Sequence, residues 1–92
     1  MPVVVISVAP GAGAEQDAAL MTALDLENNP PAGGRLRIAG PTDAGWRTIT
    51  VWDSQEDFEA FVRDRLTPTF ERFGRSVPES DVSPVESIVT LE

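Results

Sequence analysis

The sequence predicts an α+β domain in which a four-stranded antiparallel sheet carries two helices on one face. Three observations lead to this class. An apolar strand pattern opens the chain, a two-residue alternation changes to helical spacing at Ser54, and the elements follow the order strand, helix, strand, strand, helix, strand. At 92 residues the chain is expected to form one domain over 1–92.

The first strand and the first helix are indicated by composition. Residues 2–9, PVVVISVA, are rich in β-branched side chains and are followed by Pro and Gly, which predicts a strand. Apolar side chains occupy both odd and even positions of this run, so both faces of the strand are expected to be buried. Residues 14–26 contain strong helix formers, early acids and apolar residues at helical spacing, which predicts a helix.

A hairpin is expected in the middle of the chain. Residues 28–34, NNPPAGG, are dense in turn-forming residues and indicate a loop. Residues 34–40 and 45–53 each alternate with a period of two, which predicts two strands. The short link at 41–45 favours antiparallel pairing between them.

The second helix is predicted to begin at Ser54. The motif SQED resembles a capping box in which Asp57 takes the place of the usual Glu or Gln. Pro68 falls inside the helical pattern, so it either kinks the helix or, with Thr67 as a cap, begins a short helix over 68–73; we favour the break. The apolar stripe consists of Phe58, Phe61, Val62, Leu66, Phe70 and Phe73.

The last part of the chain completes the predicted order. Residues 75–84 lack periodicity and are interpreted as an acidic surface loop, and residues 85–92, VESIVTLE, alternate as a final strand. The resulting βαββαβ order is that of the ferredoxin-like fold. Because helices cover only one face of such a sheet, the two-sided first strand needs a cover on its other face, and a second copy is the simplest one.

Charge and hydropathy exclude several partners. Fifteen acidic residues against seven basic ones give a net charge of -8, which repels phosphate backbones and anionic lipids, so neither nucleic acid nor a membrane is expected as a partner. No apolar run approaches the roughly 20 residues of a membrane-spanning helix. The apolar opening lacks a basic region and is interpreted as a strand rather than a secretion signal. We expect a cytoplasmic protein.

The residue types that are absent limit the chemistry. The chain contains no Cys, His or Tyr, and all seven basic residues are arginine. Disulfides, thiolate and Schiff-base nucleophiles and sulfur or imidazole metal ligands are therefore excluded. Any catalysis must come from Asp, Glu, Arg, Ser, Thr, Trp or Asn, or from a bound cofactor. No metal and no cofactor are expected, and no catalytic residue is assigned.

A family resemblance rests on residues 33–74. Their GxxIAG-like strand, GWR opening, VWDS junction and FxxFVxxxLxP helix resemble small bacterial proteins of the dimeric α/β barrel superfamily, near the antibiotic-biosynthesis-monooxygenase-like domains. The resemblance implies a barrel-like homodimer that pairs through the sheet faces. It also implies a superfamily that includes cofactor-free monooxygenases, heme-degrading enzymes and proteins of unassigned activity. Related sequences often have His near the position of Arg37, so Arg there argues against His-dependent chemistry.

Four residues are candidates for binding a small-molecule ligand: Trp46, Trp52, Arg37 and Asp53. The two Trp side chains share one strand face and offer flat stacking surfaces, although Trp also occurs in cores and interfaces. Arg37 is suited to an oxyanion, or else to a surface ion pair, and its face depends on a strand register that the sequence leaves open. Asp53 is suited to act as a base, or else to interact with the helix terminus.

Three functions remain open. The first is a homodimer of unassigned activity that binds a small apolar or aromatic ligand without turnover. The second is a cofactor-independent monooxygenase for an electron-rich aromatic substrate, in which the substrate anion reacts with oxygen and the protein supplies Trp stacking and an arginine. The third is an assembly protein whose sheet face meets another protein. Heme degradation is disfavoured because no His is present to hold the iron.

Overall fold

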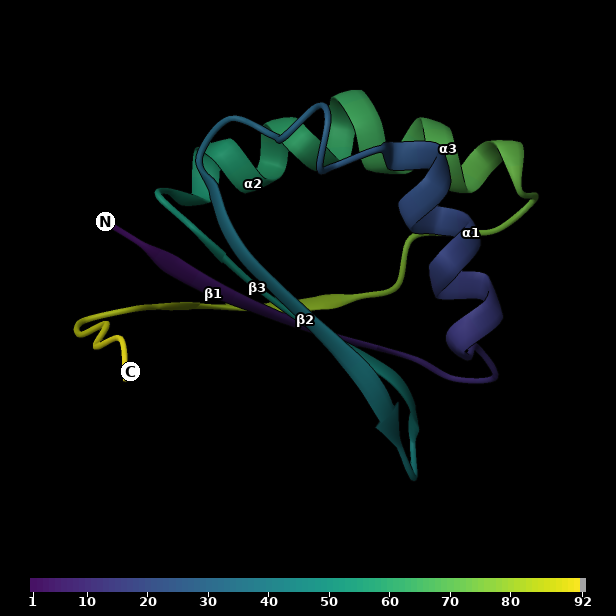
Figure 1. The fold of residues 1–92 in the computed structure, drawn as a ribbon, viewed down its shortest axis with the longest axis horizontal. Helices are drawn as coiled ribbons and strands as arrows, with labels where there is room; N and C mark the ends of the chain where they lie inside the picture. The colour runs from purple at the N-terminus through teal and green to yellow at the C-terminus, as the bar shows by residue number, and fades with distance from the viewer. Residues whose placement is uncertain (92) are drawn as a thin grey trace.

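The structure, a computed structural model, describes residues 1–91. Within them a four-stranded antiparallel sheet of order β2-β3-β1-β4 carries the helices on one face (Figure 1). This confirms the predicted ferredoxin-like α+β fold. The elements are β1 (Val3–Ala9), α1 (Ala14–Leu24), β2 (Gly34–Thr42), β3 (Gly45–Trp52), α2 (Gln55–Phe61), the π-helical turn η1 (Val62–Leu66), α3 (Thr67–Arg72) and β4 (Ser80–Pro84).

The strand register sorts the sheet into two faces. Val5 of β1 lies opposite Thr50 of β3, and Thr50 lies opposite Arg37 of β2. Because side chains alternate along a strand, these residues share the inner face, which the helices cover. The neighbouring row places Ile6, Ile49 and Ile38 together on the outer face. A bulge between Gly34 and Leu36 shifts the register of β2 at its first residues.

The core lies on the inner face around Trp52. Trp52 is 3% exposed and clusters with the buried Val3 and Val5. Its ring centroid is 5.7 Å from that of Phe58 and 5.1 Å from that of Phe61, both on α2. These tilted aromatic pairs join the end of β3 to the helix that follows it, so the strand-to-helix junction is also the centre of the core.

Both helix starts agree with the sequence, but α1 ends earlier than expected. Ser54 caps α2 by accepting a hydrogen bond from the Asp57 N–H at 3.1 Å, as the SQED motif predicts. The first helix ends at Leu24 rather than at residue 26, because Asp25 adopts a left-handed conformation with φ of 51°. A left-handed residue directly after the last turn terminates a helix.

The prediction of a break at Pro68 is wrong. Helical structure continues from Gln55 through Arg72, and η1 precedes the proline. Pro68 has no N–H to donate to the carbonyl of Asp64. The Thr67 N–H donates to the carbonyl of Val62, five residues earlier, as in a π-turn. This wider turn carries the chain past the proline, which occupies the first turn of α3.

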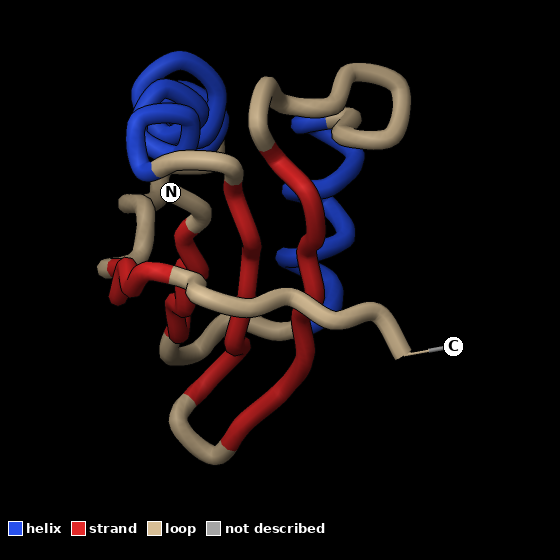
Figure 2. Tube along the Cα trace, turned by 90° about the vertical axis from the view of Figure 1, so that its left-hand side faces the viewer, coloured by secondary structure: helices blue, strands red, loops and turns tan. Residues whose placement is uncertain are grey.

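The last strand is displaced from its predicted position. β4 spans Ser80–Pro84, inside the segment interpreted as a loop, and pairs with β1, with Val82 opposite Val5. The Val85 N–H still donates to the carbonyl of Pro2 at 2.8 Å. Residues 86–91 have no strand assignment and leave the end of β4 as a loop (Figure 2), and Glu92 lies outside the described residues. The ladder between β1 and β4 ends at Pro84, because Pro84 lies opposite Val3, the first residue of β1.

The outer face is uncovered in the single chain, so the expectation that both faces of the first strand are buried is met only on the inner side. Val3 and Val5 are buried, whereas Ile6 is 38% exposed, Leu36 56% and Ile38 50%. In Figure 1 the helices all lie on the other side of the sheet. Separately, no helix within residues 1–91 has the length and apolar character to cross a membrane.

Candidate ligand pocket

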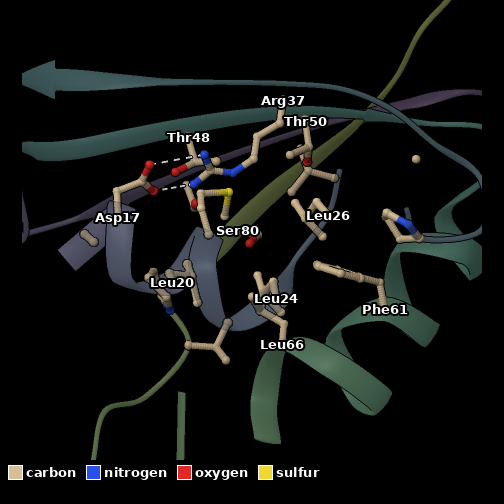
Figure 3. A pocket seen from close by; sticks show the side chains of 18 of the residues that line it. Asp17, Leu20, Leu24, Leu26, Arg37, Thr48, Thr50, Phe61, Leu66 and Ser80 are labelled. Atoms are coloured by element: carbon tan, nitrogen blue, oxygen red, sulfur yellow. Dashed lines mark hydrogen bonds and ion pairs between the residues drawn. The ribbon is translucent and has the colours of Figure 1, made fainter. Parts of the chain in front are cut away.

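A cavity of about 450 Å³ lies between the inner face of the sheet and the helices. This volume falls within the range of roughly 300–1,000 Å³ typical of small-molecule sites. Its walls are mainly apolar and aromatic, with hydroxyl groups and one ion pair among them (Figure 3). The sheet contributes Val5, Ser7, Ala9, Arg37, Trp46, Thr48, Thr50, Trp52 and Ser80, and the helices contribute Asp17, Leu20, Met21, Leu24, Phe58, Phe61, Leu66 and Phe70.

Strand β3 supplies the pocket with both Trp side chains. Trp46 lies opposite Ala9 and Trp52 opposite Val3, with Thr48 and Thr50 between them on the same face. The two-residue alternation therefore brings both rings to the cavity wall. Arg47, at the opposite parity, lies opposite Val8 and belongs to the outer face.

The two indoles differ in their hydrogen bonding. The Trp52 N–H donates to the Thr50 hydroxyl at 2.8 Å. The Trp46 Nε1 is buried, and no hydrogen-bond partner for it occurs within residues 1–91. A buried N–H without a partner costs free energy, on the order of 1–3 kcal/mol. Trp52 is thus a satisfied core residue, whereas Trp46 holds a free donor at the cavity wall.

Arg37 reaches across the pocket to Asp17. Its Nη1 donates to Asp17 Oδ2 at 3.2 Å, and its Nη2 donates to Asp17 Oδ1. The side chains are only 21% and 15% exposed, respectively. Figure 3 shows the guanidinium extending from β2 toward the first turn of α1. These two hydrogen bonds between guanidinium and carboxylate connect α1 to β2. They also place an ion pair, whose two charges neutralise each other, in the wall of the cavity.

Asp53 does not join the other three candidate residues. Its side chain is 49% exposed and forms an ion pair with Arg35, which is 55% exposed. Asp53 follows Trp52 directly, so its side chain points to the opposite side of the chain. Its backbone N–H donates to the carbonyl of Gly33 at 2.8 Å. The structure therefore brings Arg37, Trp46 and Trp52 to one cavity and leaves Asp53 at the surface.

Asp17 is the polar residue that sequence reasoning did not single out. As an early acid of a helix, it was interpreted only as favourable for the helix N-terminus. A signal was present, since Asp17, Leu20 and Leu24 follow the spacing of one helix face. The acid therefore shares the apolar face that packs toward the sheet, where a charged residue needs a partner. Among residues 1–91, no group of three or more His, Cys, Asp or Glu side chains is arranged to hold a metal ion.

The ferredoxin-like α+β fold is shared with solved structures of antibiotic-biosynthesis-monooxygenase-like proteins, the fold that the sequence resemblance predicted. Rv0793 from Mycobacterium tuberculosis superposes with a TM-score of 0.67 at 15% identity, covering 97% of this chain and 100% of that chain. A mutant of SnoaB, a cofactor-independent oxygenase from Streptomyces nogalater, superposes with a TM-score of 0.62 at 16% identity, covering 96% and 94%.

A candidate antibiotic biosynthesis monooxygenase from Chloroflexus aurantiacus superposes with a TM-score of 0.59 at 17% identity, covering 97% of this chain and 98% of its own. Searches by sequence give a different result: no protein-family model and no curated protein matches the chain. At these identities the likeness establishes the fold over nearly the whole chain, and the chemistry has to be argued from the pocket itself.

Proposed function

We propose that this protein binds an aromatic small molecule in the cavity between the sheet and the helices. The observation that carries the proposal is the unpartnered, buried N–H of Trp46 at the wall of a cavity of about 450 Å³, as seen within residues 1–91. A ligand oxygen that accepts this hydrogen bond removes the cost of leaving the donor unpaired.

The rest of the wall supports an aromatic ligand. Phe58, Phe61 and Phe70 come from the helical side, and Trp46 comes from the sheet. Aromatic rings stack or meet edge to face with such side chains, which adds about 0.5–1.5 kcal/mol per pair beyond burial alone. Few polar groups interrupt this wall, so they would orient a ligand rather than dominate its affinity.

The binding proposal is tested with the chain's own fluorescence. Both Trp residues of the chain line the cavity, so a bound aromatic ligand is expected to quench or shift their emission saturably. Titration with a panel of phenols and quinones of one to three rings, checked by calorimetry, measures this. Arg47→Gln, on the outer face, is the control and should bind as the wild type does. A linear, unsaturable response across the panel would contradict the proposal.

A second function, cofactor-independent oxygenation, is favoured by the fold shared with SnoaB, itself a cofactor-independent oxygenase. In this chemistry the anion of an electron-rich aromatic substrate reacts with oxygen, so the protein needs to supply only stacking and stabilisation of an oxyanion. Trp46 supplies a ring for stacking and an unpartnered N–H, within residues 1–91, that is able to donate to an oxyanion. Oxygen uptake with polyhydroxylated aromatic substrates, without added cofactor, tests this function. Saturable binding without oxygen uptake would favour binding alone.

We further propose that the protein is a homodimer that pairs through the outer face of its sheet. Leu36, Ile38 and Ile6 are the large apolar side chains that this face leaves exposed. Monomeric proteins rarely expose a contiguous apolar patch on one sheet face. Light scattering coupled to size exclusion is expected to give twice the chain mass, and Ile38→Glu is expected to shift it to the monomer. A monomeric wild type at micromolar concentration would contradict this proposal.

The cytoplasm is the compartment we propose for this activity. The chain has no Cys, so an oxidising compartment would not stabilise it through disulfide bonds. Its net charge of -8 disfavours binding to anionic membranes. Fractionation of cells that express the full chain is expected to place it in the soluble cytoplasmic fraction, and recovery in the medium or membrane fraction would contradict this.

A further inference from the structure

We propose that Asp17 makes the cavity selective for uncharged aromatic ligands over anionic ones, because it neutralises the guanidinium of Arg37. The inference rests on the ligand-binding function proposed above and concerns the same cavity. It assigns a specificity-determining role to a residue on α1, whereas both Trp rings of the cavity come from strand β3.

The charges around the cavity fall into two groups. Glu27, Arg35 and Arg75 lie at its edge and are solvent-exposed, so water screens them. Arg37 and Asp17 are the charged lining residues that are largely shielded, at 21% and 15% side-chain exposure. Charge interactions weaken much less in a shielded site than at the surface. The ligand's charge is therefore sensed mainly by this pair.

A paired guanidinium is a poor receptor for an anion. Arg37 directs its two terminal nitrogens at the two oxygens of Asp17, with Nη1 to Oδ2 at 3.2 Å. A ligand carboxylate that approaches Arg37 gains attraction from the guanidinium but also meets the repulsion of the Asp17 carboxylate beside it. The net charge of -8 adds to that repulsion at longer range.

An uncharged ligand avoids this conflict. A phenol or aromatic carbonyl oxygen is able to accept the free N–H of Trp46 without disturbing the ion pair. Its ring still gains the aromatic contacts of the wall. The geometry thus separates two roles: Trp46 offers a donor to a neutral oxygen, and Asp17 keeps Arg37 from recruiting an anion.

The test compares 2-naphthol, which is neutral at pH 7, with 2-naphthoate, which is an anion of similar shape. Binding of both is measured by calorimetry and Trp fluorescence to the full chain. The wild type is expected to bind naphthol about tenfold or more tightly than naphthoate, as one uncompensated shielded charge implies. Asp17→Asn keeps the shape of the side chain and removes its charge. It is expected to strengthen naphthoate binding about tenfold while naphthol changes by less than about threefold.

The matched control is Glu27→Gln, which removes an exposed acid at the edge of the same cavity. Its ratio of affinities should stay within about twofold of the wild type, because water screens this charge. Arg37→Gln provides a second readout that does not depend on the folding of D17N. It leaves Asp17 uncompensated and should weaken naphthoate about tenfold relative to naphthol.

The outcomes separate the two proposals. Equal affinities of the wild type for the two ligands, or a D17N or R37Q ratio that matches E27Q, would overturn the selectivity while leaving ligand binding in place. Absence of binding of both ligands to every variant would overturn the ligand-binding function, and the selectivity with it.

Discussion

The indole N–H of Trp52 donates to the hydroxyl of Thr50, two residues earlier on the same face of β3, at 2.8 Å. This bond satisfies the polar atom of a side chain that is 3% exposed. Trp46, four positions before Thr50 on the same face, has no comparable partner within the described part of the chain. Strand β3 thus carries Trp52, whose role is structural, and Trp46, whose N–H is available to a ligand. Substitutions at the two positions are expected to affect stability and ligand binding separately.

Trp52→Ala is expected to destabilise the protein severely. The change removes the two ring contacts to Phe58 and Phe61 and leaves a cavity in the core. Such truncations cost about 3–5 kcal/mol in the free energy of unfolding. Urea denaturation followed by circular dichroism measures the loss. A loss below about 1 kcal/mol would show that the core is not centred on this residue.

Trp46→Phe is expected to weaken ligand binding with little change in stability. Phe retains an aromatic ring but lacks the N–H, so it removes a donor that has no partner in the folded chain. A phenol or quinone that binds the wild type should lose about tenfold in affinity, the value of one hydrogen bond of about 1–1.5 kcal/mol.

Calorimetric titration of Trp46→Phe measures the affinity, and urea denaturation measures the stability. The control is the same titration with naphthalene, which has no acceptor and should bind wild type and variant alike. Unchanged affinity for the phenol would show that Trp46 supplies only a surface for stacking.

Ser54→Ala is expected to destabilise α2 by about 1 kcal/mol. The Ser54 hydroxyl accepts the N–H of Asp57 at 3.1 Å, and Ala leaves that first-turn donor without a side-chain partner. Ser54→Asp restores an acceptor and should recover most of the stability. The midpoints of urea unfolding of the three proteins decide the matter, and equal midpoints for Ser and Ala would mean that water caps the helix equally well.

The sequence predicts those features of the fold that depend on neighbouring residues, and it misses those that depend on residues distant in the chain. The β3–α2 junction was predictable because strand alternation and the Ser54 cap are local. The π-turn before Pro68 was not, because it is the response of a packed helix to a missing N–H rather than a pattern of residues. The position of β4 depends on where β1 begins, at Val3, which lies far away in the chain.

The candidate site divides in the same way. Parity along β3 placed Trp46 and Trp52 together without any knowledge of the partner strands. The sheet face on which Arg37 lies depended on the β2–β3 register, which the sequence left open. A bulge between Gly34 and Leu36 interrupts that register at Arg35, and Arg35 pairs with Asp53 rather than with Asp17. Asp17 becomes part of the site only when α1 packs over β2, so the ion pair is a tertiary feature.

Gly45→Ala is expected to destabilise the protein strongly where the start of β3 meets the end of β1. Gly45 has φ of 142°, which side chains with a Cβ rarely adopt, and a Cβ there would lie 2.5 Å from the carbonyl oxygen of Ala9. The oxygen belongs to the backbone of β1, so it is not free to rotate away.

Gly11→Ala is the matched control: its φ of 78° is also unfavourable, but a Cβ there has nothing within 4 Å. Gly11→Ala should cost about 1 kcal/mol, the backbone term alone, and Gly45→Ala about 2–3 kcal/mol more, because the clash forces β1 to shift. Urea denaturation of both variants measures the difference. Equal losses in the free energy of unfolding would mean that β1 and β3 move apart at Ala9 and Gly45 without cost. Since Trp46 adjoins Gly45 and lies opposite Ala9, the shift should also lower the affinity for a phenolic ligand, which Gly11→Ala should leave intact.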